Sequence, residues 1–361
     1  MPDDRISTRQ LLTLLFAALL SPAIRLLPAR TAAVAGTAAW LSALAALPAV
    51  LGLCWVLFAL LRPAEEGVGL PQVFQQVLGK PLGKTVTALY LLWGLFLLCV
   101  NARLVALRFL ATSYRNAPLL LFITTLLGVT LWLVRKPIRV LARMGEIFYL
   151  ILAIGVGATL LFGAFQIEAY HVWPVWKEDI PGILTASVSV LGLMGYTVFA
   201  AVLAGHVRHR EEDRRHALAW AGVFCGVLTA LQLVCLGAFG PALIMRMDTP
   251  FFMMVKGIGI EGSFQRVESL VIALWVLSDL ALLALLAGAC SVLAHCVCTR
   301  IERKKWVWLI IPGALIGAVT LFPNVFVLEQ IMLSIALPGN LIFGFLIPFV
   351  VLLVKKLRTK V

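Results

Sequence analysis

The chain has 361 residues, of which 62% are hydrophobic and only 13% are charged, and its mean hydropathy is +1.02. Because about a quarter of the residues of a soluble globular protein are charged, this composition excludes a soluble protein and predicts an integral membrane protein. The net charge of +13 is explained by contact with anionic lipid head groups, so we expect the lipid bilayer as a partner and no nucleic acid.

Apolar runs that are long enough to cross a membrane recur along the whole chain. A helix needs about 20 residues to span roughly 30 Å of hydrocarbon. Ten runs approach or exceed this length, at residues 11–29, 35–61, 85–111, 118–134, 145–166, 182–205, 216–243, 268–294, 306–323 and 332–354. The connections between them are mostly short. The sequence therefore predicts an all-α integral membrane protein with about ten transmembrane helices, in which residues 1–361 form a single domain.

The positions of Lys and Arg predict the orientation in the membrane. Short basic clusters occur at 135–143, 208–215, 300–305 and 355–360. All of them fall on one side if the chain crosses the membrane ten times. Basic residues in short loops favour the cytoplasmic side, so we expect both termini to be cytoplasmic.

Two of the ten runs are interrupted in the middle by residues that break helices. Ser21-Pro22 interrupts the first run, and a stretch that contains Gly192, Gly195 and Tyr196 interrupts the sixth. The two runs are counterparts if the chain consists of two repeats of five helices, and paired interruptions indicate a substrate site at the membrane midplane. The sequence thus predicts a small-molecule site carried by helices 1 and 6. The alternative is that the glycines only let neighbouring backbones approach closely.

Ionisable residues inside the predicted spans are functional candidates, because lipid is a costly environment for them. Arg25 follows the first interruption, where its guanidinium can bind a substrate carboxylate; the alternative is that it extends to the outer interface. Asp279 is the deepest acid, and we expect it to face the bundle interior, with a coupling-ion, proton or ligand role or in a structural ion pair. The third span contributes Asn101, Arg103 and Arg108. The two arginines lie about 140° apart around a helix, so we expect one to turn inward and the other to reach the interface.

The sequence contains none of the usual motifs of soluble enzymes. A phosphate-binding glycine loop, a nucleophile elbow and a His-Glu-x-x-His motif are all absent from it. His295, Cys296 and Cys298 lack a second ligand pair at the spacing of a zinc site. We therefore expect no catalytic residues, no metal and no cofactor.

Four stretches resemble those of one family of membrane proteins. Residues 6–10, Ile-Ser-Thr-Arg-Gln, are similar to the start of its first helix, and residues 35–40, Ala-Gly-Thr-Ala-Ala-Trp, to the start of its second. Residues 188–196 resemble its broken sixth helix. The most specific stretch is 264–270, Phe-Gln-Arg-Val-Glu-Ser-Leu, which is followed by Trp275 and resembles the start of its eighth helix. From about residue 5 to about residue 355, the chain resembles the spore-germination permease family, within the amino acid–polyamine–organocation superfamily.

This resemblance implies a ten-helix fold of two inverted repeats with five helices each. It also implies a membrane B subunit of a nutrient germinant receptor, which binds a small nutrient, usually an amino acid, in the spore inner membrane. Its companions would be a larger A subunit and a lipoprotein C subunit. By position, the pocket would be lined by Ser21, Pro22, Ala23, Gly192, Gly195 and Tyr196. The chain departs from the superfamily by having no glycine at the break of helix 1 and by Ala38-Ala39 where an acidic residue is common.

Three functions are consistent with these features. The first is a nutrient receptor, in which ligand binding shifts a conformational equilibrium that partner subunits detect. The second is an amino-acid transporter of the same fold, in which Asp279 couples proton or ion movement to substrate movement. The third is a scaffold that organises partner subunits without binding a ligand. An enzyme is the least favoured class.

Overall fold

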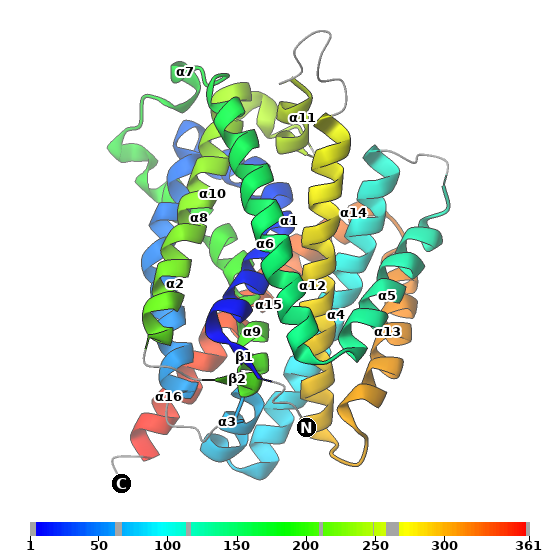
Figure 1. Cartoon of the computed structure of the whole chain (residues 1–361). Helices are drawn as coiled ribbons and strands as arrows, with labels where there is room; N and C mark the ends of the chain where they lie inside the picture. Colours follow the sequence, from blue (N-terminus) through cyan, green and yellow to red (C-terminus); the bar gives the residue numbers. More distant parts are fainter. Residues whose placement is uncertain are drawn as a thin grey trace.

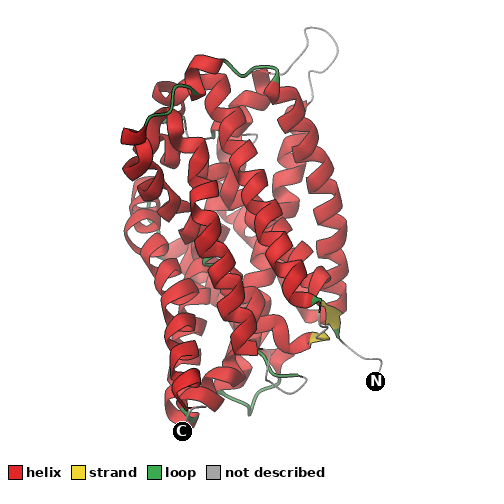
Figure 2. Ribbon diagram, turned by 90° about the vertical axis from the view of Figure 1, so that its left-hand side faces the viewer, coloured by secondary structure: helices red, strands yellow, loops and turns green. Residues whose placement is uncertain are grey.

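The computed structural model describes residues 5–61, 67–112, 117–208, 212–247, 249–257 and 267–358. Nearly all of them are helical, and the long helices run side by side in one bundle (Figures 1 and 2). The predicted all-α membrane fold is confirmed. Strands are limited, in the described part of the chain, to the short pair β1 (Ile6–Ser7) and β2 (Val207–Arg208).

Each of the ten predicted runs corresponds to one helix or to a continuous series of helices. The first five are α1 (Thr8–Ala35), η1 with α2 (Gly36–Leu41, Ser42–Leu61), α4 (Lys80–Thr112), α5 (Leu119–Arg135) and α6 (Ile138–Ala164). The second five are α8 with α9 (Ile180–Met194, Thr197–Leu203), α10 (Asp213–Ile244), α12 (Val267–Val297), α13 (Arg303–Thr320) and a tenth series. The tenth series consists of α14 (Val325–Ile331), η4 (Met332–Ala336), α15 (Leu337–Leu341), η5 (Ile342–Leu346) and α16 (Ile347–Arg358). The connections contain α3 (Leu70–Leu78), α7 (Ala169–Val172), η2 (Lys177–Asp179), η3 (Ala204–His206) and α11 (Pro250–Gly257).

Seven helical stretches of the described residues are long and apolar enough to cross a membrane. The first of these, Thr8–Leu61, contains two of the predicted runs. Two other predicted runs fall outside this set for local reasons, since α5 is short and α13 begins with Arg303-Lys304-Lys305. All ten runs predicted from the sequence are therefore helical in the structure, although two of them are too short or too charged to belong to the set of seven.

The helix contacts repeat between the two halves of the chain. Helix α1 packs against α6, and its counterpart α8 packs against α15. In the same way α1 packs against α10 and α8 against α2, while α4 packs against α13 and α12 against α5. In each of these three pairs, one contact becomes the other when every helix is replaced by its counterpart in the other half, helix 1 by helix 6, helix 2 by helix 7 and so on. This pattern is that of a five-plus-five repeat.

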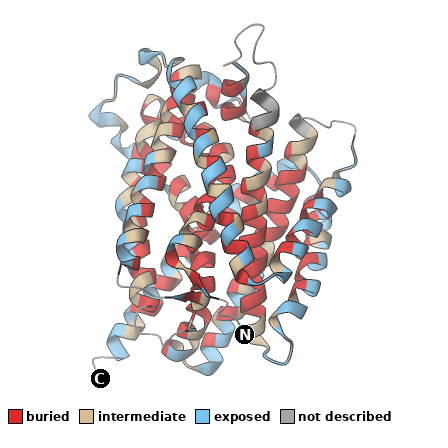
Figure 3. Ribbon diagram, viewed as in Figure 1, coloured by how far each residue is buried: buried red, intermediate tan, exposed pale blue. Residues whose placement is uncertain are grey.

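Helix α1 lies at the centre of the bundle. It contacts α6, α8, α10 and α12, and most of its residues between Leu11 and Leu27 are buried. The peripheral helices are buried on one face and exposed on the other (Figure 3). Many of their exposed residues are large and apolar. An apolar exterior is suited to a bilayer, because lipid tails are as apolar as these side chains.

Both ends of the described chain lie at the same end of the bundle, opposite α7 and α11 (Figure 1). There β1 pairs in parallel with β2, which ties the start of helix 1 to the end of helix 6. Basic side chains at this end lie over tryptophan rings: Arg135 over Trp308 at 4.7 Å and Lys136 over Trp132 at 5.1 Å. Tryptophan and basic residues together are typical of a membrane–water interface.

Candidate functional site

The predicted interruption of helix 1 is wrong as a break in the backbone. Helix α1 continues through Pro22 and Pro28. Ser278 of α12 bonds to the backbone next to the proline: it accepts a bond from the Ser21 N–H at 2.8 Å and donates one to the Ala17 carbonyl at 2.5 Å. An uninterrupted helix pairs these two groups with each other. Neighbouring helices thus supply the hydrogen bonds that let a membrane helix keep a proline.

Ser21, Arg108 and Asp279 form a buried polar triad that joins α1, α4 and α12. The Ser21 hydroxyl donates to Asp279 Oδ1 at 2.5 Å. Arg108 Nη1 lies 2.9 Å from Asp279 Oδ2 and 2.6 Å from Ser21 Oγ. The side chains of Arg108 and Asp279 are only 7% and 4% exposed, and the guanidinium also lies over the Trp275 ring at 5.1 Å. Asp279 is therefore held in an ion pair with two hydrogen-bonding partners.

The structure buries both arginines of helix 3. Arg108 turns to Asp279, but Arg103 is also only 9% exposed, so the expectation that the second arginine reaches the interface is wrong. The reason is that α4 is covered on several sides, by α3, α5, α12 and α13. The Arg103 Nε atom has no hydrogen-bond partner among the described residues.

Helix 6 is interrupted at Gly195 and Tyr196, which form a turn between α8 and α9. The Gly195 N–H donates to the Leu191 carbonyl at 3.0 Å, and the Tyr196 N–H donates to the Leu193 carbonyl at 3.3 Å. Both N–H groups of the turn are therefore bonded to carbonyls of α8, and the backbone is not unwound. In this conformation neither N–H is available to a ligand carboxylate.

The two glycines of helix 6 allow helix 10 to approach closely. A Cβ atom at Gly195 would clash with the backbone carbonyl of Asn340, and Gly344 packs on the Gly195 backbone. A Cβ at Gly192 would lie 3.0 Å from the Leu337 side chain. Both glycines therefore allow close packing of helices 6 and 10, which is the alternative that the sequence analysis left open.

Tyr196 belongs to a second polar cluster, between helices 3, 6 and 10. Its hydroxyl accepts a bond from Asn101 Nδ2 at 3.0 Å, and Tyr196 and Asn340 line one small cavity together. Trp93 Nε1 donates to Asn340 Oδ1 at 3.1 Å. Asn340 was not predicted from the sequence, although an asparagine in the middle of an apolar run was a signal for it.

A small cavity lies between α1, α8 and helix 10, beside this cluster. Its volume is about 30 Å³, and its lining includes Arg30, Ser189, Gly192, Tyr196 and Asn340. A water molecule needs about 10–15 Å³ on this measure. The cavity therefore holds about two waters, and it must widen before a nutrient can enter.

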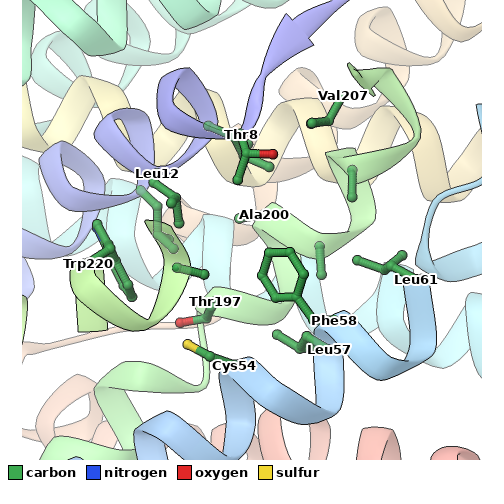
Figure 4. Close-up of a pocket in the computed structure, with 15 residues that line it drawn as sticks. Thr8, Leu12, Cys54, Leu57, Phe58, Leu61, Thr197, Ala200, Val207 and Trp220 are labelled. Carbon is green, nitrogen blue, oxygen red and sulfur yellow. The ribbon is translucent and has the colours of Figure 1, made fainter. Parts of the chain in front are cut away.

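A second cavity, of about 70 Å³, lies beside α9 on the side of the break that faces the termini (Figure 4). It is enclosed mainly by apolar side chains, among them Leu12, Phe58 and Trp220. Thr197, directly after the break, also lines it, and its hydroxyl has no hydrogen-bond partner among the described residues. The space next to the break is therefore lined by apolar side chains and offers a ligand few polar groups.

Arg25 is a residue of the predicted site with a hydrogen-bond donor that no described residue accepts. It lies one turn after Ser21 on the same face of α1, next to the fully buried Ala23 and Pro22. Arg108, Asp279 and Tyr196 lie within its electrostatic range. Its Nε atom is buried without a partner in the part of the chain that the structure describes. Because a buried unpaired donor is costly, this guanidinium is suited to an anionic ligand.

Like Asn340, Gln232 is a buried polar group that the sequence analysis did not single out. Gln232 of α10 lies between Thr31 of α1 and Ser42 of α2, with its Oε1 atom 2.9 Å and 2.7 Å from their hydroxyls.

Of the predicted motif at 264–270, residues 264–266 lie outside the described residues.

Comparison with known proteins agrees with this architecture. The chain is 24% identical over 381 aligned residues to spore germination protein KB of Bacillus subtilis (strain 168), covering 100% of this chain and 98% of that protein. Its structure is similar to that of MhsT in complex with L-phenylalanine, with a TM-score of 0.64, 16% identity, and coverage of 96% of this chain and 90% of that one. MhsT has the LeuT fold, which is built from inverted repeats. A model of the spore germination protein family matches residues 5–326, and because this match spans most of the sequence, the chain belongs to that family.

Proposed function

We propose that this chain is the membrane subunit of a spore nutrient-germinant receptor, and that it binds an amino acid near the membrane midplane, between helices 1 and 6. The observation that carries the proposal is Arg25 of the central helix α1, whose Nε donor is buried without a partner among the described residues. An arginine can bind a carboxylate through two parallel hydrogen bonds. Asn340 and Ser189, which line the adjoining cavity, are suited to the ligand's polar groups.

Binding and signalling are linked through the size of the cavity. A space of about 30 Å³ is too small for an amino acid, so the ligand binds only when helix 10 or helix 6 moves away from α1. A ligand shifts such an equilibrium by its difference in affinity for the two conformations. We propose that the A and C subunits of the receptor detect this movement, and that the chain lies in the spore inner membrane with both termini in the cytoplasm.

The test is a deletion of the gene, complemented with variants, in which dipicolinate release from spores is measured over a panel of amino acids, sugars and nucleosides. Arg25→Gln is expected to abolish the response to the nutrients that the intact gene restores, because the ligand carboxylate loses its partner. Arg143→Gln, which changes an exposed arginine on α6, is the matched control and is expected to leave the response unchanged. A normal response of the Arg25→Gln spores at normal protein abundance would refute the site.

A transporter is the second candidate, and the structural similarity to an amino-acid-bound transporter fold favours it. In that case Asp279 would have to leave Arg108 during each cycle to take up a proton or an ion. Uptake of a radiolabelled amino acid into liposomes separates the two functions. Uptake that is driven by a pH gradient and lost in Asp279→Asn would place the transporter first.

A further inference from the structure

An apolar groove of about 460 Å³ runs along the outside of the bundle, between α2 and helix 10. It is lined by side chains that include Ala49, Gly52 and Trp55 from α2, and Leu341, Phe345 and Phe349 from helix 10. Gly52 leaves the floor open, since a Cβ atom there would meet no atom of the described residues within 4 Å. At this depth the groove faces hydrocarbon, where water does not fill it.

One end of the groove carries positive charge. Lys355 donates to the Ala59 and Leu60 carbonyls at 3.3 Å and 2.7 Å, and so joins helix 10 to the last turn of α2. Lys356 is exposed, and its Nζ atom lies 5.0 Å from the ring of Trp55, a residue of the groove wall. Seven residues separate Lys356 from Phe349, so both lie on the same helix face. The ammonium group is thus at the mouth of the groove, at the end of the bundle that holds the termini.

From this arrangement we infer that the groove binds one anionic phospholipid, with an acyl chain between α2 and helix 10 and the phosphate at Lys356. The site is separate from the nutrient site. Basic residues between membrane helices are suited to anionic head groups, and an apolar groove of this shape is suited to a single chain.

The length of the groove argues against a transmembrane helix of a partner. Ala49 and Trp55 are six residues apart, and Leu341 and Phe349 are eight residues apart, which corresponds to about 9–12 Å along a helix. A partner helix that crosses roughly 30 Å of hydrocarbon would need a contact face about three times as long. An acyl chain crosses only one leaflet, about 15 Å of hydrocarbon, so the observed length covers most of it.

The experiment uses the full chain in nanodiscs that contain a trace of phosphatidylglycerol with a photoreactive acyl chain, or phosphatidylcholine with the same chain. Labelled peptides are identified by mass spectrometry. We expect label in residues 49–56 and 341–349, with about fivefold more from phosphatidylglycerol, because one lysine near an anionic head group has about this effect. Lys356→Gln is expected to remove that preference, and Gly52→Leu to remove label from both lipids.

The chain offers a matched control for each variant. Lys136 also lies over a tryptophan, Trp132, at 5.1 Å, so Lys136→Gln tests a lysine–tryptophan pair away from the groove. Gly128, on α5, also has no described atom near an added Cβ, so Gly128→Leu tests an exposed glycine away from it. Neither control is expected to change labelling of the two segments. If Gly52→Leu fails to insert, Ala49→Leu fills the same groove.

Three results would overturn the inference. Equal labelling by the two lipids, or equal labelling of Gly52→Leu and Gly128→Leu, would show that lipid contacts the groove only as bulk solvent. A particle mass of two copies that falls to one copy in Gly52→Leu would assign the groove to a second copy of the chain.

Discussion

Removal of either partner of the Arg108–Asp279 pair should cost at least as much as removal of both. Asp279→Asn removes the carboxylate that the buried guanidinium contacts, and Arg108→Gln removes the guanidinium that the buried carboxylate contacts. Breaking a buried ion pair in this way costs about 3–5 kcal/mol. We expect the lower end of this range, about 3 kcal/mol for each single variant, because Ser21 still bonds to the group that remains.

The double variant tests whether the two charges act as a pair. Arg108→Gln with Asp279→Asn removes both charges, so its cost should not exceed that of either single variant, and the coupling free energy should be about 3 kcal/mol. The measurement is reversible unfolding of the purified protein in mixed micelles, followed by fluorescence, for the wild type, the two single variants and the double variant.

A surface pair provides the control for this cycle. Glu302 and Lys305 approach to 3.9 Å, but their side chains are 76% and 69% exposed, so Glu302→Gln and Lys305→Gln should show coupling near zero. If the coupling of Arg108 with Asp279 is as small as that of the control pair, the triad does not hold helices 3 and 8 together, and the account of Asp279 given above is wrong.

Three further substitutions test the contacts around helix 6 and the base of helix 10. Gly195→Ala should lower stability and nutrient response together, because its Cβ meets the Asn340 carbonyl; normal values in both assays would contradict the close packing. Tyr196→Phe should lower the free energy of unfolding by about 1 kcal/mol through loss of the bond from Asn101, and an unchanged midpoint would show that this bond is not formed. Lys355→Met should cost a similar amount by uncapping the last turn of α2, measured by hydrogen exchange at residues 59–61, where unchanged protection would argue against the cap.

The sequence by itself determined the transmembrane segments and the position of the break in helix 6. Membrane insertion depends on the length and hydropathy of each segment, which are local properties that can be counted along the chain. The glycine, tyrosine and threonine at 195–197 are likewise a local signal for a weak point in a helix. The predicted break at Ser21-Pro22 was wrong because the helix continues through Pro22, where Ser278 of α12 bonds to the backbone groups of Ala17 and Ser21 next to the proline.

Only the tertiary structure decided which polar groups meet. The angle between Arg103 and Arg108 is fixed within one helix, but the rotation of that helix against α12 is not, and this rotation selects Arg108 as the partner of Asp279. The same reason hid the contact of Asn340 with Trp93. Periodicity in the sequence shows which residues share a face of a helix. Packing against neighbouring helices decides which faces touch, and the pairing of polar residues depends on this packing.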